Sequence, residues 1–194
     1  MLIAPLSAPH VDAVARLHCA SLTGLLSQLG VPAARAYYGG CVKTDAAIGL
    51  VCIDGDTVRG FVLGSIHPDA LKQAVVRNNL VATLAGLCAG IVRRPVALKW
   101  LLASMRRPDD PGYDPQAPEL TYLAVAADCR QAGIGKRLVD AFSAAMRHAG
   151  ARGYELSVDD DNVPAIAFYE RLRFQLIGRY REFGILHRRY RLEC

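Results

Sequence analysis

The residues that most clearly suggest a binding site form a glycine-rich turn, Arg130-Gln131-Ala132-Gly133-Ile134-Gly135-Lys136. Its two glycines let backbone N–H groups approach a ligand closely. Apolar residues then recur with a helical period at Ile134, Leu138, Ala141, Phe142 and Ala145. Because a helix begins with a partial positive charge, such a turn is suited to a diphosphate. We therefore interpret it as a phosphate-binding loop between a strand and a helix.

Two widespread phosphate-binding loops do not fit this turn. A nucleoside-triphosphatase loop needs a first glycine where Arg130 stands and a hydroxyl side chain where Arg137 stands, so its magnesium ligand is absent. A dinucleotide loop needs a third glycine at the position of Leu138. The sequence therefore excludes the first class and gives only weak support to the second.

A third pattern, Arg/Gln-x-x-Gly-x-Gly/Ala, matches in full at Arg130, Gly133 and Gly135. A strand that ends in Leu-Ala-Val precedes it, and Asn162 and the run Phe-Tyr-Glu-Arg-Leu-Arg-Phe at 168–174 follow it. On these residues the chain resembles the GNAT superfamily of acetyl-CoA-dependent N-acetyltransferases. The resemblance is strongest over about sixty residues, from Glu119 to Gly178.

Three positions depart from the pattern of that family. Many members carry proline where Ala127 stands and glycine where Gln131 stands, and both positions tolerate change. Arg173 replaces the usual glycine at the end of the last helix. That glycine normally supports a left-handed helix cap, so the backbone at Arg173 is the position to check in the structure.

The resemblance implies that acetyl-CoA is the co-substrate and that no metal is needed. The backbone of Leu123–Val125 would pair with the pantetheine arm, and the Val125 N–H would support the oxyanion. Asn162 would hold the pantetheine or simply cap its helix. The expected acetyl-CoA-binding residues are Leu123, Ala124, Val125, Arg130, Gln131, Ala132, Gly133, Ile134, Gly135, Lys136, Asn162 and Tyr169.

The implied reaction is attack of a neutral amine on a thioester, which needs a base for the ammonium proton and an acid for the leaving sulfur. Tyr169 occupies the place where the family often has that acid, although it could equally be a packing residue. Glu119 is a candidate base, or else a surface carboxylate at a strand edge. Asp159–Asp161 could attract a cationic acceptor or form a solvated loop. Water as the proton acceptor remains a further alternative.

Length, charge and cysteine content limit the classes of protein to which the chain could belong. The chain has 194 residues, 52% of them hydrophobic, and 23 Lys and Arg against 18 Asp and Glu. This length predicts a single domain over 1–194. The basic residues are scattered except near the carboxyl end, which favours a solvated surface over nucleic-acid binding. The six cysteines form neither CxxC pairs nor zinc-spaced clusters, so we expect free thiols, no metal and a cytoplasmic location.

The hydrophobic pattern predicts a mixed α/β (α+β) order. Helices are expected over 8–22 and 25–42, with a break at Gly30 and an end at Gly39-Gly40, and a hairpin over 48–66 turns at Asp54-Gly55. The expected later elements are helices over 69–107 with a break near Pro95, a strand over 119–127, a helix from Ile134, a strand over 154–158, a helix over 162–172, and strands over 174–183 and 185–192. This order agrees with a GNAT fold: a mixed, mostly antiparallel sheet flanked by helices, with a helical insert at about 70–107 before the fourth strand. The fourth and fifth strands should splay apart.

We thus expect an acyltransferase that moves an acetyl group to a primary amine, on an amino sugar or another small molecule. The alternative is a non-enzymatic CoA-binding or scaffold module of the same fold. The apolar run at 80–92 is too short to span a bilayer and is expected to be a buried helix or one that lies on a membrane surface. We expect no nucleic-acid partner and no stable membrane insertion, and a homodimer is compatible with the sequence.

Overall fold

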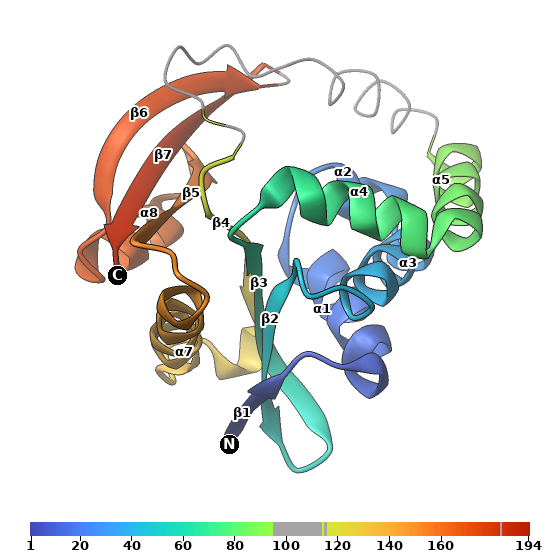
Figure 1. The fold of residues 1–194 in the computed structure, drawn as a ribbon, viewed down its shortest axis with the longest axis horizontal. Coiled ribbons are helices and arrows are strands. Elements are labelled where there is room, and N and C mark those ends of the chain that lie inside the picture. Colours follow the sequence, from blue (N-terminus) through green and yellow to red (C-terminus); the bar gives the residue numbers. More distant parts are fainter. Residues whose placement is uncertain (95–113, 115, 183) are drawn as a thin grey trace.

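A seven-stranded mixed sheet forms the centre of the protein (Figure 1). The structure is a computed structural model that describes residues 1–94, 114, 116–182 and 184–194. The strand order is β1-β2-β3-β4-β5-β7-β6. The strands are β1 (Leu2–Pro5), β2 (Ile48–Asp54), β3 (Thr57–Ser65), β4 (Glu119–Val125), β5 (Gly153–Asp159), β6 (Gln175–Glu182) and β7 (Ile185–Glu193).

Helices cover both faces of this sheet. The helices and short 3-10 turns are η1 (Ala8–His10), α1 (Val11–Ser21), α2 (Leu25–Leu29), α3 (Val31–Cys41), α4 (Pro68–Asn78), α5 (Leu80–Arg93), η2 (Ala127–Cys129), α7 (Ile134–His148) and α8 (Val163–Arg171). One buried core joins the sheet to α7 and α8, and a second joins it to α1, α3 and α4. Figure 1 shows the two groups of helices on opposite sides of the sheet. The expected fold class is confirmed.

The sheet splits between β4 and β5. These strands are parallel and share one registered pair, Glu119 with Glu155, while every other neighbouring pair in the sheet is antiparallel. Beyond Glu119, β4 keeps its register with β3 as far as Val125. Meanwhile β5 pairs with β7 along its whole length. The edge of β4 that faces β5 is therefore open from Leu120 to Val125, and the predicted splay is confirmed.

Several element boundaries differ from the sequence prediction. Strand β1 was not expected, because four residues are too few to show an alternating pattern. Helix α3 continues past Gly39-Gly40 to Cys41, since Gly40 packs directly against the backbone of Val75. The breaks at Gly30 and Gly55 are confirmed, and both glycines have positive φ.

The helical insert begins as predicted and has a further break that the sequence analysis did not include. Helices α4 and α5 meet at Asn79, whose side-chain amide donates to the Ala36 carbonyl oxygen at 2.7 Å. The expected break near Pro95 and the expected helix over 95–107 lie outside the described residues. None of the described helices alone has the length and hydropathy of a membrane span, although α4 and α5, joined at a 91° bend, meet that test as a pair.

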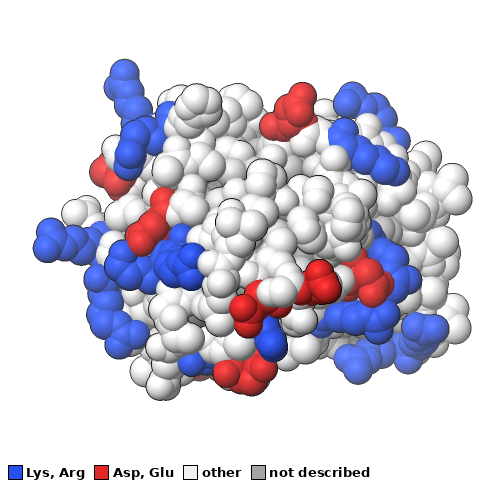
Figure 2. Space-filling model, turned by 90° about the horizontal axis from the view of Figure 1, so that it is seen from below, with Lys and Arg blue, Asp and Glu red and all other residues white. Residues whose placement is uncertain are grey.

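Charge is spread over the surface. On the face shown in Figure 2, Lys and Arg side chains occur in separate groups with Asp and Glu between them. Many of the described charges are paired locally, for example Arg16 with Asp12, Lys136 with Asp140 and Arg188 with Asp160. The scattered arrangement expected from the sequence is thus seen on this face.

Candidate active site

The glycine-rich turn joins β4 to α7 through two residues with left-handed backbone. Gln131 has φ 64° and Gly133, which caps α7, has φ 76°. A Cβ added at Gly133 would meet no atom within 4 Å, so open space lies beside this backbone. At Gly135 an added Cβ would approach the ring of Phe168 to 3.2 Å, which explains the second glycine as a close contact between α7 and α8. The first N–H groups of α7 therefore face an uncovered concavity.

The open edge of β4 presents backbone donors to the same concavity. Ala126 N–H donates to the Arg59 carbonyl oxygen of β3 at 2.8 Å. Because successive N–H groups of an extended strand point to opposite sides, the N–H groups of Val125 and Leu123 point away from β3. They face the gap between β4 and β5, where an extended substrate arm can pair with them.

Helix α8 supplies the opposite wall. Asn162 caps this helix, and its Oδ1 accepts from the Ala165 N–H at 3.2 Å. Tyr169 is 9% exposed and lies against Phe168 and Phe174, with ring centroids 5.2 and 5.4 Å away. Burial raises the pKa of Tyr169 well above its ordinary value. The phenol therefore keeps its proton at neutral pH and can act as a donor.

A cleft of about 940 Å³ joins these elements. The residues that line it are Ser21, Leu22, Leu123, Ala124, Val125, Cys129, Arg130, Gln131, Gly133, Ile134, Gly135, Lys136, Asn162, Pro164, Ala165, Ala167, Phe168, Tyr169, Arg171 and Leu172. Every residue predicted to bind acetyl-CoA is on this wall except Ala132, whose side chain is exposed beside it. Glu119 does not line the cleft either.

The sequence prediction did not include several lining residues. Those on α8, such as Ala165, Phe168 and Leu172, share one helical face with Tyr169, so their spacing could have revealed them. Ser21 and Leu22 come from the end of α1 and reach the cleft only through the tertiary fold. No local pattern in the sequence marks them.

Glu119 lies at the closed end of the split, opposite Glu155. A bulge in β4 leaves Thr121 without a partner in β3, and consequently Leu120 packs in the α7–α8 core while Tyr122 packs in the α1–α3 core. Burial raises the pKa of the Glu119 carboxyl, and the charge of Glu155 adds to this effect. A raised pKa suits a general base. Leu123 is four residues further along the strand, about 13 Å away at 3.3 Å per residue, so contact with the cleft requires a water path.

The acidic group Asp159–Asp161 is largely engaged within the protein. Asp159 is 3.0 Å from His187 Nδ1, and Arg188 Nε donates to Asp160 Oδ1 at 2.6 Å. The hydrogen bond from Arg188 holds the pKa of Asp160 below its usual value. These two carboxylates join the end of β5 to β7, which is a structural role.

The backbone and side chains that line the cleft suit the chemical groups of an acyl-CoA. The uncovered backbone at Gly133 and the start of α7 form a cradle for a diphosphate. The open edge of β4 can hold an amide-containing arm, and the apolar wall of Phe168 and Leu172 suits its methylene groups. Within the described residues, no group of three or more His, Cys, Asp or Glu side chains could hold a metal ion.

Comparison with known proteins decides the family. The model of the acetyltransferase (GNAT) family matches residues 12–174. The chain belongs to the GNAT acetyltransferase family. This GNAT protein is accordingly an acyltransferase, and its predicted family resemblance is confirmed.

One curated relative matches a short part of this GNAT protein. A 5-NmdU N-acetyltransferase from Pseudomonas phage PaMx11 is 38% identical over 65 residues, which are 32% of this chain and 44% of that protein. The match thus spans less than half of the relative.

Many solved structures share the fold, and two of them are complexes with coenzyme A or acetyl-CoA. An aminoglycoside 6'-N-acetyltransferase complexed with coenzyme A has a TM-score of 0.63 and 13% identity, covering 100% of this chain and 97% of that one. Arabidopsis thaliana NAA60 in complex with acetyl-CoA has a TM-score of 0.60 and 15% identity, covering 99% and 97%.

Proposed function

We propose that this GNAT protein transfers the acetyl group of acetyl-CoA directly to the primary amine of a small molecule. The observation that carries the proposal is the split between β4 and β5, which opens onto the cleft at the start of α7. In the two solved structures named above, coenzyme A or acetyl-CoA is bound by proteins of the same fold.

The glycine-rich turn would bind the diphosphate of the co-substrate. Gly133 leaves room for it, and the N–H groups of Ile134, Gly135 and Lys136 have no intrahelical partner at this end of α7. The Leu123 and Val125 N–H groups would pair with the pantetheine arm. The Val125 N–H then lies at the end of the open edge, where it can donate to the oxyanion of the tetrahedral state.

Two proton transfers complete the reaction. The Tyr169 hydroxyl has no hydrogen-bond partner among the described residues and remains protonated at neutral pH, so it can protonate the departing thiolate. The ammonium proton of the acceptor would leave through water toward Glu119, whose raised pKa brings it closer to the working range of a base. The contact of Asp159 with His187 and the ion pair of Asp160 with Arg188 make those carboxylates weaker candidates for this role.

The acceptor is proposed as an amino sugar or another small amine. The phage relative is named for 5-NmdU and one structural neighbour for an aminoglycoside, and both names support a small amine as the acceptor. We expect the segment before β4 to contribute to the acceptor site, and part of it, 108–113 and 115, lies outside the described residues. All six cysteines are free thiols, which supports the expected cytoplasmic location.

The direct test is release of the CoA thiol from acetyl-CoA in the presence of single amines. The panel should hold amino sugars, polyamines, 5-NmdU and a peptide with a free amino terminus. We expect acetyl-CoA to bind and at least one class of small amine to raise thiol release above the rate without amine. Binding without turnover on any amine would support the alternative of a CoA-binding module. Absence of acetyl-CoA binding would overturn the assignment of the cleft.

A further inference from the structure

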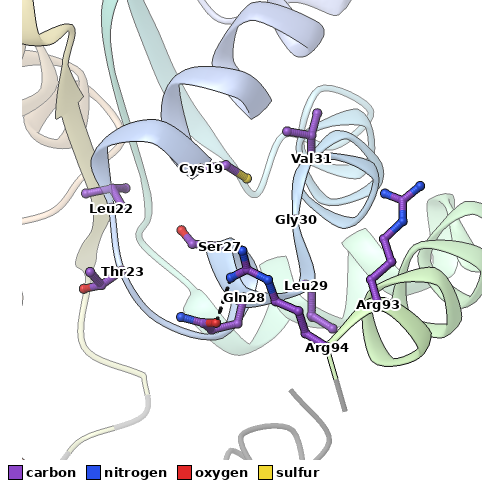
Figure 3. Close-up of a pocket in the computed structure, with 10 residues that line it drawn as sticks. All are labelled: Cys19, Leu22, Thr23, Ser27, Gln28, Leu29, Gly30, Val31, Arg93 and Arg94. Carbon is purple, nitrogen blue, oxygen red and sulfur yellow. Dashed lines mark hydrogen bonds between the residues drawn. The ribbon is translucent and has the colours of Figure 1, made fainter. Parts of the chain in front are cut away.

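A second cavity lies beside the cleft, on the side of the amino-terminal helices (Figure 3). It has a volume of about 370 Å³ and is enclosed by the end of α1, by α2, by the start of α3 and by the end of α5. Leu22 lines both the cavity and the cleft, so the two spaces are neighbours with one shared wall residue. A molecule in this cavity therefore lies next to the cleft in which the acetyl group is proposed to be transferred.

Close packing through two glycines brings the end of α5 to this cavity. A Cβ added at Gly86 would approach Ala33 to 2.8 Å, and one at Gly90 would approach Leu29 to 2.8 Å. Both glycines are buried against α2 and α3. The helix therefore lies on its neighbours without intervening side chains, and its last residue, Arg93, and the following Arg94 reach the rim of the cavity.

The charged side chains that line the cavity are all basic. Its charged lining residues are Arg93 and Arg94, and none of the described residues that line it is acidic. Arg94 donates to Gln28 Oε1 at 3.2 Å, a neutral partner that fixes its direction and leaves its charge uncompensated. Figure 3 shows this bond at the base of the cavity. Within the described part of the chain, neither guanidinium forms an ion pair with a carboxylate.

Helix ends of both signs meet at this cavity. Gly30 and Val31 lie at the start of α3, which carries partial positive charge, while the ends of α1 and α5 in the same wall carry partial negative charge. The two arginines therefore determine the sign of the site. The Ser27 hydroxyl is buried in the same wall and has no hydrogen-bond partner among the described residues. The oxygen is covered in this rotamer, so it could donate to a ligand oxygen only after the side chain rotates toward the cavity.

We propose that this cavity is the acceptor subsite and that it binds an anionic group, a carboxylate or a phosphate, carried by the amine substrate. The inference rests on the proposed acetyl transfer. Arg94 and Arg93 would bind the anionic end by charge-assisted hydrogen bonds. The amine, at the other end of the same molecule, would then extend past Leu22 into the cleft. The acceptor is accordingly zwitterionic at neutral pH.

Matched pairs of amines test this preference. The probes are O-phosphoethanolamine with ethanolamine, glucosamine 6-phosphate with glucosamine, and β-alanine with β-alaninamide, so that the pairs separate phosphate from carboxylate. For each probe, kcat/KM is measured by thiol release, and the affinity for the enzyme–CoA complex is measured by calorimetric titration. For at least one pair we expect the anionic member to exceed its neutral partner by roughly tenfold or more, the effect of one charged hydrogen bond. The advantage should shrink as salt is added.

Variants then assign the effect to the cavity. Arg94→Gln should raise KM for the preferred anionic amine by roughly tenfold while leaving its neutral partner and acetyl-CoA affinity unchanged. Arg93→Gln should show the same pattern more weakly, because no described hydrogen bond fixes its direction. Arg77→Gln is the matched control, since this exposed arginine at the end of α4 lines neither space.

Each result bears on a separate part of the argument. If acetyl-CoA binds but every anionic amine matches its neutral partner in affinity, or none of the anionic amines binds, the subsite proposal is overturned and the acetyl-transfer proposal stands. An anion preference that Arg94→Gln and Arg77→Gln leave equally intact also overturns it. Failure of acetyl-CoA itself to bind overturns the proposed function instead.

Discussion

Two residues show that part of the family pattern reflects the conformation of the backbone and not the side chain. Gln131 and Arg173 are the non-glycine residues with positive φ in the described structure, at 64° and 67°. They stand at two of the positions where glycine is common in the family. Left-handed backbone costs a non-glycine residue roughly 1–2 kcal/mol, so the surrounding fold imposes this geometry. The question that the sequence raised at Arg173 is thereby answered: the cap keeps its conformation without glycine.

The hydroxyl of Tyr169 separates a catalytic role from a packing role. Tyr169→Phe keeps the ring that contacts Phe168 and Phe174 and removes the proton donor. We expect kcat to fall on the order of 10²-fold, the lower range for loss of a general acid. Acetyl-CoA affinity should change little. Single-turnover thiol release and calorimetric titration measure the two quantities.

Tyr154→Phe provides the control for that substitution. Tyr154 is fully buried in the same core, its hydroxyl is hydrogen-bonded to Ser143, and it does not line the cleft. The Tyr154→Phe variant should be less stable than wild type, and its kcat should be unchanged. If Tyr169→Phe behaved as Tyr154→Phe does, Tyr169 would be a packing residue and another acid would be needed.

Glu119 should leave a signature in the pH–rate profile if it accepts the ammonium proton through water. Glu119→Gln should then lower kcat/KM most near neutral pH. The deficit should shrink as pH rises, because free amine becomes abundant and no longer needs a protein base. Asp161→Asn, in the exposed part of the acidic loop, is the comparison. A Glu119→Gln enzyme that equals wild type at every pH would leave Glu119 as a structural carboxylate beside Tyr122.

At the level of elements, local patterns predicted those parts whose own residues determine their shape. The apolar stripe of α7 and the Asp54-Gly55 turn were visible in sequence because each depends on residues close together in the chain. The break between α4 and α5 was not, since Asn79 ends α4 through a hydrogen bond to Ala36, 43 residues away. The register shift at Thr121, which decides the face on which Glu119 lies, is likewise set by the neighbouring strand.

The turn before α7 is the element whose change should remove co-substrate binding. Gly133→Asp would place a side chain and a negative charge in the uncovered space at the start of the helix. We expect acetyl-CoA affinity to fall by roughly 100-fold or more, because the lost helix-end interaction is replaced by charge repulsion. Calorimetric titration with acetyl-CoA measures this.

Gly55→Asp controls for the backbone cost. Gly55 also has positive φ, 58°, with no atom within 4 Å of an added Cβ, and it lies in the β2–β3 turn away from the cleft. Both variants should lose similar stability, while Gly133→Asp alone should lose affinity. Unchanged binding in a folded Gly133→Asp protein would remove the turn from the site.

At the level of the whole molecule, the sheet separates two hydrophobic cores, and each lies beside a different part of the proposed site. The α7–α8 side carries the glycine-rich turn and Tyr169, and the α1–α3 side carries the cavity with Arg94. The first side could be predicted from sequence because its residues fall within one motif-bearing segment. The second could not, since Cys19 of α1, Ser27 of α2 and Arg94 just after α5 come together only after folding.

His18 gives the α1–α3 core a dependence on pH. Its side chain is fully buried between α1 and the sheet, and its Nδ1 shares a 2.7 Å hydrogen bond with the Tyr38 hydroxyl. Its Nε2 has no partner among the described residues. Burial lowers the pKa of His18 to about 4, so the folded protein keeps it neutral where an unfolded chain would be protonated. The charged form would need a partner for Nε2 that the described core does not supply.

This difference predicts lower stability in mild acid. Below pH 6.5 the unfolded state takes up a proton that the folded state refuses until about pH 4, so the free energy of unfolding falls as pH decreases through that window. Between pH 7 and pH 5 the loss from His18 is about 2 kcal/mol. Urea unfolding at both pH values should show this loss in wild type beyond that of His18→Gln. If the variant folds poorly, NMR titration of wild type decides: a His18 ring that titrates near 6.5 would contradict the prediction, because protonation would then cost the folded core nothing.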